Sequence, residues 1–287
     1  MKPAAFDYHR VDTADETIER LAELGDEAKV LAGGQSLVPM MNFRLVRPPA
    51  LVDVSRVAEL RGLRRVRNSL AIGALTRHAE VEHAAADDLA GGFEILRRAA
   101  RFVGHFPIRA RGTFGGSVAH ADPAAEWCML AVALDAEIVV RGPDGRRTVP
   151  AREFFAGFFT TTLEPAEIVE EVRFPRPWRH AAIQEFARRH GDFAIVAAVV
   201  ALEIDPTHPG VVRDARVVVG GVDEVPVRAE AAEAALRGRA SDTFADAAKA
   251  AAAEVDPSGD IHGSAEYRRE LTGVLVRRAL DEARDAG

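Results

Sequence analysis

The sequence contains two motifs with paired glycines, each beside a stretch that has a clear secondary-structure pattern. The first, Ala32-Gly33-Gly34-Gln35-Ser36, continues from residues 29–32, which are typical of a buried strand. The second is Thr113-Phe114-Gly115-Gly116-Ser117. Paired glycines permit positive φ angles and leave the backbone N–H groups unobstructed, so several N–H groups can converge on one phosphate. Both motifs are therefore candidate phosphate-binding loops.

A glycine pair alone is more typical of a tight turn, and this chain has other pairs at Gly91-Gly92 and Gly220-Gly221. The hydroxyl and amide side chains beside the glycines of both motifs favour phosphate binding. After the second motif, His120, Asp122 and Glu126 are candidate partners for the hydroxyls of a ribose or ribityl chain. Asp122 is equally a candidate helix N-cap, because the proline that follows it suits a first helical turn.

The first part of the chain predicts a small α/β unit that ends near residue 57. Thr13 and Glu16 form a capping-box pattern, apolar residues follow at helical spacing, and Gly25 closes the helix. A second strand is expected at residues 51–54, after the first glycine motif.

The next part predicts an α+β arrangement without regular alternation of strands and helices. Hairpins are expected at residues 63–74 and 137–149, helices at 76–85 and 88–103, and a closing strand at 168–174. Beyond a boundary at Pro175-Arg176-Pro177, strands at 193–204 and 211–219 precede helices at 229–236, 244–254 and 266–283. The last third is therefore expected to be a small sheet covered by helices.

Composition excludes several classes of function. The formal net charge of -7 argues against a nucleic-acid-binding protein, because phosphate contacts need clustered cations. Cys128 is the only cysteine, which excludes an internal disulfide and an internal iron–sulfur cluster, since such a cluster takes roughly four thiolates. The sequence has no dinucleotide fingerprint, no phosphate loop ending in Gly-Lys-Ser/Thr and no zinc-protease motif. The histidines have no metal-ligand spacing, so no bound metal is expected, and no nucleophile-and-base pattern predicts a catalytic residue.

The sequence also carries an expectation about location. Its first ten residues have no apolar stretch of the signal-peptide type. The longest apolar run, residues 193–202, is far shorter than the ~18 residues of a membrane span. A cytoplasmic protein with no membrane span is therefore expected.

Six motifs follow one another along the whole chain and are together far more specific than one glycine pair. The first three are Phe6-Asp7-Tyr8, residues 32–37, and Ile72-Gly73-Ala74 followed by Thr76. The other three are residues 111–117, residues 119–126, and Arg189-His190-Gly191-Asp192-Phe193-Ala194. With these motifs the chain resembles the FAD-binding medium subunits of aerobic carbon monoxide dehydrogenases and their relatives in the xanthine dehydrogenase family, the molybdenum hydroxylases.

The resemblance implies an α+β fold: an FAD-binding domain at residues 1–177, made of α/β subdomains at about 1–57 and 58–177, and a flavoprotein C-terminal domain at 178–287. The C-terminal domain would be a small antiparallel sheet covered by helices. The resemblance also implies that the two glycine motifs hold the FAD pyrophosphate and the nearby sugar chain. The implied cofactor-binding residues are Ala32, Gly33, Gly34, Gln35, Ser36, Leu37, Thr113, Gly115, Gly116, Ser117, His120, Asp122, Glu126, Ile168, Val169, Asp192 and Phe193.

The chain departs from the family pattern at two places. The second motif has Phe114 and Ser117 where relatives often have isoleucine and asparagine, and serine has a shorter reach for a hydrogen bond. Relatives that reduce nicotinamide nucleotides place a lysine near the flavin, whereas residues 185–189 contain no lysine, and Arg188 is a candidate substitute.

By resemblance, this chain is the electron-transfer subunit of a larger complex, expected as a dimer of heterotrimers. A large subunit with the molybdenum cofactor would oxidise the substrate, and a small subunit with [2Fe-2S] clusters would pass electrons to FAD on this chain. An alternative is a stand-alone flavoprotein oxidase or reductase that acts directly on a small molecule. A third is a scaffold that has lost its cofactor, to which Phe114 and Ser117 lend slight support. The substrate and the electron acceptor stay open, because the substrate pocket would belong to another chain.

Overall fold

The N-terminal part of the chain forms a small unit around a parallel sheet. The computed structural model describes residues 2–286. The sheet has the strand order β1-β3-β2, with β1 at Asp7–Arg10, β2 at Lys29–Leu31 and β3 at Ala50–Asp53. Helix α1 (Ala14–Leu24) covers the sheet, α2 (Leu37–Asn42) follows the first glycine motif, and a 3₁₀ turn, Ala58–Leu60, leads out of the unit.

The capping box expected for the first helix is confirmed. The Thr13 hydroxyl accepts a hydrogen bond from Glu16 N, the Glu16 carboxylate accepts one from Thr13 N, and Gly25 ends the helix with φ +72°. Strand β1 was not expected from the sequence. Its four residues are polar and largely exposed, so no apolar alternation marks them, and parallel pairing with β3 makes them a strand.

The middle part of the chain is built on a five-stranded antiparallel sheet in the order β4-β5-β10-β6-β7. Both expected hairpins and the closing strand are confirmed, and the closing strand lies at the centre of the sheet. The strands are β4 (Leu63–Val66), β5 (Ser69–Gly73), β6 (Glu137–Gly142), β7 (Gly145–Pro150) and β10 (Ile168–Phe174), with a small ribbon of β8 (Phe155–Gly157) and β9 (Thr160–Thr161).

The helices of this middle part are shorter than expected. Where the sequence predicted helices at 76–85 and 88–103, the chain forms three separate short helices. Gly91 and Gly92 adopt φ +78° and +122°, which a right-handed helix cannot contain, and the Gly92 carbonyl accepts a hydrogen bond from Trp178 N. The helices are α3 (His78–Glu82), α4 (Ala86–Leu89), α5 (Glu94–Ala100), α6 (Phe106–Arg109), α7 (Phe114–His120), α8 (Glu126–Ala133) and α9 (Ala151–Phe154).

The C-terminal part is an antiparallel sheet with the order β11-β12-β13-β14, covered by three helices. The expected strands and helices are confirmed within a few residues, and β11, which has no clear sequence pattern, is additional. The elements are β11 (His180–Phe186), β12 (Val196–Ile204), β13 (Val212–Gly220), β14 (Val227–Arg228), α10 (Glu230–Leu236), a 3₁₀ turn at Ser241–Thr243, α11 (Phe244–Glu254) and α12 (Ala265–Asp285).

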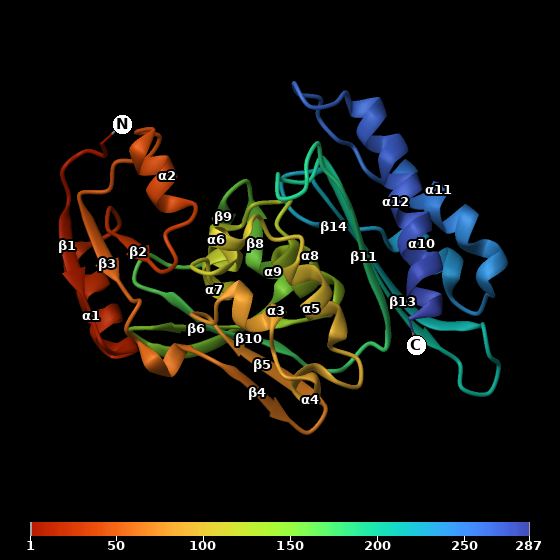
Figure 1. Cartoon of the computed structure of the whole chain (residues 1–287), viewed down its shortest axis with the longest axis horizontal. Helices are drawn as coiled ribbons and strands as arrows, with labels where there is room; N and C mark the ends of the chain where they lie inside the picture. Colours follow the sequence, from red (N-terminus) through yellow and green to blue (C-terminus); the bar gives the residue numbers. More distant parts are fainter. Residues whose placement is uncertain (1, 287) are drawn as a thin grey trace.

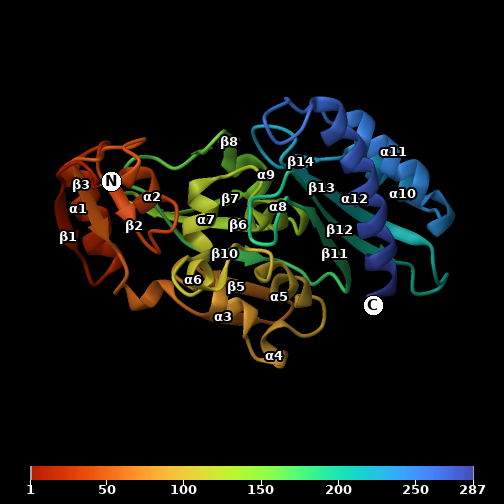
Figure 2. The ribbon, with the colours of Figure 1, turned by 45° about the horizontal axis from the view of Figure 1, so that its top comes forward.

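Both faces of this C-terminal sheet are buried. Helices α10, α11 and α12 pack on one face, and α5 and α8 of the middle part pack on the other, so the sheet lies between them (Figures 1 and 2). Residues 196–202 are all buried, with odd-numbered side chains facing α8 and even-numbered ones facing α12. This explains why the sequence shows a continuous apolar run here instead of an alternating one.

Among the helices of residues 2–286, none has the length and apolar character that crossing a bilayer requires. The longest, α12, carries charged side chains along its length.

Candidate functional site

The two glycine motifs, far apart in the sequence, are in direct contact. A Cβ atom on Gly33 would lie 2.4 Å from the Arg111 carbonyl oxygen and 2.7 Å from Gly112 Cα. A Cβ atom on Gly116 would lie 3.8 Å from Ala32 Cβ. Only a residue without a side chain allows the first motif to approach the second so closely. The motifs therefore form one site between the N-terminal and middle parts of the chain.

The first motif is a loop, as the sequence predicted. It joins β2 to α2, and Gly34 adopts φ +70°, a conformation that favours glycine. The Gln35 side-chain amide donates a hydrogen bond to the Gly33 carbonyl (3.1 Å). The N–H groups of residues 33–36 have no hydrogen-bond acceptor within residues 2–286. The loop thus presents several free donors beside the second motif.

The second motif is not a loop, and this corrects the sequence-based prediction. Thr113 is the N-cap of α7, its hydroxyl accepts a hydrogen bond from Gly116 N (3.2 Å), and the glycines are helical. Neither Gly115 nor Gly116 has a positive φ. Gly115 instead packs so closely on Ala74 that no side chain fits there. A Cβ atom added to Gly115 would lie 2.4 Å from Ala74 Cβ.

Phe114, which departs from the family pattern, points into the core. Its ring packs on Trp127 at a centroid distance of 4.5 Å and edge-on against Phe174 at 6.2 Å. It is fully buried, so it fills space behind the motif and does not line the contact between the two glycine segments. Ser117, the other departure, lies one helical turn further along α7 and is partly buried.

A cavity of about 240 Å³ opens where the two motifs meet. Ala32, Gly33 and Thr113 line it, together with Ser55 and Leu75. The remaining lining residues are three arginines, Arg61, Arg77 and Arg111.

These arginines carry positive charge that is not neutralised. None of the three has a carboxylate within 4.0 Å among the described residues, although most of the arginines in this chain form ion pairs. Arg61 donates to the Ser55 carbonyl (2.7 Å). Three unpaired guanidinium groups beside free N–H donors suit an anion with several oxygens, such as a pyrophosphate.

Sequence reasoning missed these arginines as site residues. Arg111 could have been found, because it directly precedes Gly112 and Thr113. Arg77 pairs with Thr113 through an isolated β-bridge, and Arg61 arrives from the turn before β4, so neither has a sequence signal that connects it to the motif.

A larger cavity of about 730 Å³ lies between the middle and C-terminal parts. Pro123 and Ala124 line one side, and Asp192 and Phe193 line the other, so two more of the predicted segments come together here. Phe193 is 73% exposed, which leaves an aromatic face available at the cavity. Gly191, which precedes Asp192 and Phe193, packs closely on His105. A Cβ atom added to Gly191 would lie 2.4 Å from the His105 ring.

Arg268 organises the loops around this larger cavity. Its side chain is buried, and its Nη1 donates to the carbonyl oxygens of Ile195 and Gly221 while its Nη2 contacts Asp260 at 2.8 Å. One side chain of α12 therefore ties together three loops from the C-terminal part. No sequence pattern singled out Arg268.

The polar residues predicted after the second motif run from the last residue of α7, His120, to the first residue of α8, Glu126, and none of them lines either cavity. The His120 ring packs on Phe159 at 4.9 Å, and burial lowers the pKa of His120. Asp122 accepts a hydrogen bond from Ala124 N (2.9 Å), and its pKa is raised by burial. The proposed N-cap role of Asp122 is wrong, because α8 begins later, at Glu126, and Ala125 is its N-cap. Burial, and then repulsion from Asp122, raises the pKa of Glu126 to about 7.

Ile168 and Val169 begin the central strand β10 and are buried. The Ile168 side chain packs in the core of the N-terminal part, and Val169 packs in the core of the middle part. Neither residue lines either cavity, so their role near the cofactor remains a prediction from the resemblance.

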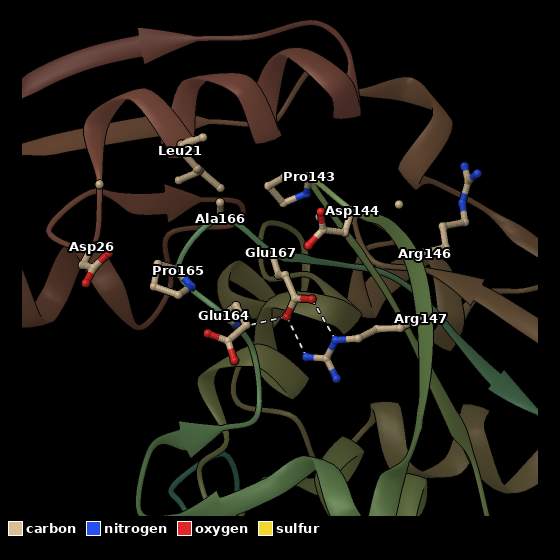
Figure 3. Close-up of a pocket in the computed structure, with 14 residues that line it drawn as sticks. Leu21, Asp26, Pro143, Asp144, Arg146, Arg147, Glu164, Pro165, Ala166 and Glu167 are labelled. Carbon is tan, nitrogen blue, oxygen red and sulfur yellow. Dashed lines mark hydrogen bonds and ion pairs between the residues drawn. The ribbon is translucent and has the colours of Figure 1, made fainter.

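A third cavity, of about 400 Å³, lies away from these segments (Figure 3). It is bounded by the end of α1, the β6–β7 turn and residues 164–167, and none of the predicted site residues lines it. Its Arg147 is already paired with Glu167, at 2.7 and 2.6 Å, and the other acidic residues point apart. Within residues 2–286, no three His, Cys, Asp or Glu side chains are arranged to hold a metal ion. This cavity has no convergent set of free donors or acceptors.

Comparison with known families decides what kind of protein carries this site. Residues 4–177 match the family described as the FAD binding domain in molybdopterin dehydrogenase, and residues 181–283 match the CO dehydrogenase flavoprotein C-terminal domain. The chain belongs to this family of FAD-binding subunits. The expected family, the α+β fold class, FAD as the cofactor and membership of an oxidoreductase family are thereby confirmed.

The similarity extends over full-length proteins. The 6-hydroxypseudooxynicotine dehydrogenase complex subunit alpha of Paenarthrobacter nicotinovorans is 40% identical over 287 residues, which are 99% of this chain and 96% of the relative. The carbon monoxide dehydrogenase medium chain of Hydrogenophaga pseudoflava is 35% identical, over 99% and 98%. Among solved structures, quinoline 2-oxidoreductase from Pseudomonas putida 86 matches with a TM-score of 0.93 and 36% identity, covering 100% of this chain and 99% of the other.

Proposed function

We propose that this chain binds FAD across the two cavities, with the pyrophosphate where the glycine motifs meet and the flavin ring toward Asp192 and Phe193. The observation that carries the proposal is the contact of Gly33 with the Arg111–Gly112 backbone. It brings free N–H groups, the capped start of α7 and three unpaired arginines to one place. An acidic chain would otherwise repel an anionic cofactor.

The spacing of the two cavities supports an extended dinucleotide. Thr113 lines the smaller cavity and Pro123 lines the larger one, and α7 connects them. At ~1.5 Å rise per residue, the seven residues of α7 cover about 10 Å. A ligand with a phosphate at one end of α7 and a ring at the other must be long, which fits FAD better than a mononucleotide.

The remaining predicted residues take supporting roles in this proposal. Gln35, Ser36, Leu37 and Ser117 flank the pyrophosphate, and the polar groups of His120, Asp122 and Glu126 face the sugar chain. With a raised pKa, the Glu126 carboxyl can hold a proton near neutral pH and donate to an oxygen of the cofactor. No residue of this chain is proposed to act on a substrate.

Membership of this family supports an electron-transfer role for the chain. A bound flavin accepts electrons one at a time from an iron–sulfur cluster and gives them up singly or as a pair. We therefore propose that [2Fe-2S] clusters on a small subunit deliver electrons to this chain, that a molybdenum-cofactor large subunit oxidises the substrate, and that the complex is a dimer of heterotrimers. The single buried cysteine, Cys128, is consistent with clusters on another chain.

The division of the chain into an FAD-binding domain at 1–177 and a C-terminal domain at 178–287 is part of the same proposal. It is supported by the separate sheets and by the short connection between β10 and β11. The cytoplasmic location stays a prediction, which fractionation of the source cells would test.

Membership of the family does not select one small molecule as the substrate, because relatives are named for carbon monoxide, caffeine and 6-hydroxypseudooxynicotine.

The proposal is tested first by the visible absorption spectrum of the purified chain before and after addition of FAD, followed by gel filtration. We expect a retained flavin spectrum and quenched flavin fluorescence. A chain that retains no flavin alone, and none when co-expressed with molybdenum-cofactor and iron–sulfur partner subunits, would refute cofactor binding at this site.

The same preparations separate the subunit role from the stand-alone alternative. A partner-bound subunit should co-purify with molybdenum and iron, and its flavin should be reduced by substrate only in the complex. Reduction of the flavin by a small-molecule substrate on the isolated chain would favour a stand-alone oxidase or reductase.

A further inference from the structure

The motif Phe6-Asp7-Tyr8 near the start of the chain lines none of the cavities described above. Tyr8 lies on β1, where it pairs with Leu51 of the neighbouring strand β3 (Figure 1). Because side chains alternate along a strand, Asp53, two residues after Leu51, is on the same face of β3. The Tyr8 hydroxyl donates a hydrogen bond to Oδ2 of Asp53. The motif therefore contacts the end of β3 through one side chain.

Asp53 in turn holds the turn that follows β3. Its side chain is buried, and its Oδ1 accepts a hydrogen bond from Ser55 N (2.8 Å), as in an Asx turn. Burial alone would raise the pKa of Asp53, but hydrogen bonds from the Tyr8 hydroxyl and from Ser55 lower it below its ordinary value. Asp53 is thus an ionised carboxylate whose two oxygens join β1 to the turn at Ser55.

The Ser55 carbonyl leads from this turn to the smaller cavity. It accepts a hydrogen bond from Nη2 of Arg61 (2.7 Å). Ser55 and Arg61 both line the cavity, next to Gly33 of the first glycine motif. Arg61 has no carboxylate partner among the described residues, so the Ser55 carbonyl is what orients its guanidinium. A long side chain that is oriented before an anion arrives loses less freedom when the anion binds.

We propose that Tyr8 and Asp53 are positioning residues for anion binding at the smaller cavity. The Tyr8 hydroxyl orients Asp53, and Asp53 holds Ser55 in its turn. The Ser55 carbonyl then keeps the Arg61 guanidinium at the edge of the cavity. This inference rests on the proposed function, because the anion there is the FAD pyrophosphate. Tyr8 and Asp53 themselves lie outside the cavity and act only through Arg61.

A double-mutant cycle with Arg61 separates this positioning role from general stability. Tyr8→Phe removes only the hydroxyl, and Asp53→Asn removes the charge while keeping the shape of the side chain. We expect each change to raise the FAD Kd, measured by quenching of flavin fluorescence, about threefold to tenfold, as for the loss of one hydrogen bond. In an Arg61→Met background the same changes should raise Kd by no more than about twofold, because the group that they position is gone.

Asp7→Asn is the matched control for the change of charge. Asp7 precedes Tyr8 on β1 and is exposed, and its side chain makes no hydrogen bond or ion pair among the described residues. Its substitution should leave the FAD Kd within about twofold in both backgrounds. Urea denaturation checks that every variant is folded. An unchanged Kd in Tyr8→Phe and Asp53→Asn, or an equal rise with and without Arg61, would overturn the positioning role.

Inorganic pyrophosphate distinguishes that failure from a failure of the proposed function. Titrated into the chain without FAD in a calorimeter, it should bind more weakly to Tyr8→Phe and Asp53→Asn than to the unsubstituted chain, by the same factors as FAD. Equal binding of both ligands by all of these proteins would overturn the positioning role and leave the proposed function standing. Binding of pyrophosphate without FAD would refute the proposed function, and the pyrophosphate cycle would then decide the positioning role. Binding of neither ligand would refute both.

Discussion

The glycines of the candidate site are required for two different physical reasons. Gly34 has a positive φ that other residues adopt only with strain, whereas Gly33 and Gly115 have ordinary backbone angles and no room for a Cβ atom. The sequence suggested positive φ angles for the glycines of both motifs. In the second motif the glycines have no positive φ, and the reason for glycine is that Gly115 leaves no room for a Cβ atom.

Gly33→Ala should therefore separate the two motifs without unfolding the protein. Its Cβ would lie 2.4 Å from the Arg111 carbonyl, so the backbone must shift by a few tenths of an ångström or more, and we expect FAD to bind at least about tenfold more weakly. Gly273→Ala is the control, because its Cβ would meet nothing closer than 3.5 Å on α12.

The control should raise the free energy of unfolding by about 0.5 to 1 kcal/mol through helix propensity and leave FAD affinity unchanged. Fluorescence titration with FAD and urea denaturation measure the two effects. Unaltered affinity in Gly33→Ala would mean that the contact between the motifs does not form the site.

At the scale of elements, α7 is the part of the site that differs most from the sequence-based expectation. It is a seven-residue helix whose start depends on Thr113, because the Thr113 hydroxyl accepts the Gly116 N–H. Thr113 also lines the smaller cavity, so one side chain both begins the helix and borders the proposed pyrophosphate position. Helix capping and cofactor binding are therefore linked at this residue.

Thr113→Ala should lower the free energy of unfolding by about 1 kcal/mol and also weaken FAD binding, whereas Thr113→Ser should retain most of both. Thr13→Ala is the matched control: Thr13 caps α1 by accepting from Glu16 N (3.1 Å), and it lines neither cavity. It should cost similar stability without changing FAD affinity. Equal losses of affinity in Thr113→Ala and Thr13→Ala would show that the effect on FAD is one of general stability.

At the scale of the whole molecule, packing of segments far apart in the sequence buries titratable groups and shifts their pKa values in opposite directions. His78 on α3 accepts a hydrogen bond from Trp127 of α8 (2.9 Å), and its Nε2 would lie 2.6 Å from a Cβ on Gly112. Burial, and then Arg109, lowers the pKa of His78 to about 4. Burial shifts the pKa of Glu126 in the opposite direction, to about 7.

His78 should make the protein less stable in acid. The unfolded chain binds a proton on this histidine below about pH 6.5 while the folded chain does not until about pH 4, so stability falls as the pH drops across that window, by an amount of the order of 3 kcal/mol. His78→Asn keeps an acceptor for Trp127 but does not titrate. Urea denaturation gives the free energy of unfolding of both proteins as a function of pH. Above about pH 7 the difference between the two proteins should be constant, and below about pH 6 it should change with pH. A constant difference below pH 6 would contradict a buried neutral His78.

The sequence by itself determined the elements with strong local signals and the family. The capping box at Thr13 and Glu16, the hairpins and the C-terminal helices rest on interactions between residues close in the chain, which a single sequence displays. The order of motifs identified the FAD-binding family.

Only the tertiary structure decided how the site is assembled. Several features depend on segments far apart in the chain: the pairing of β1 with β3, the helical state of the second motif, the three arginines at the smaller cavity and the hydrogen bond of Trp127 to His78. Such contacts leave no periodic signal, because each side is selected by its partner and not by its neighbours in sequence. The sequence therefore defined which motifs matter, and the fold defined which of their atoms face one another.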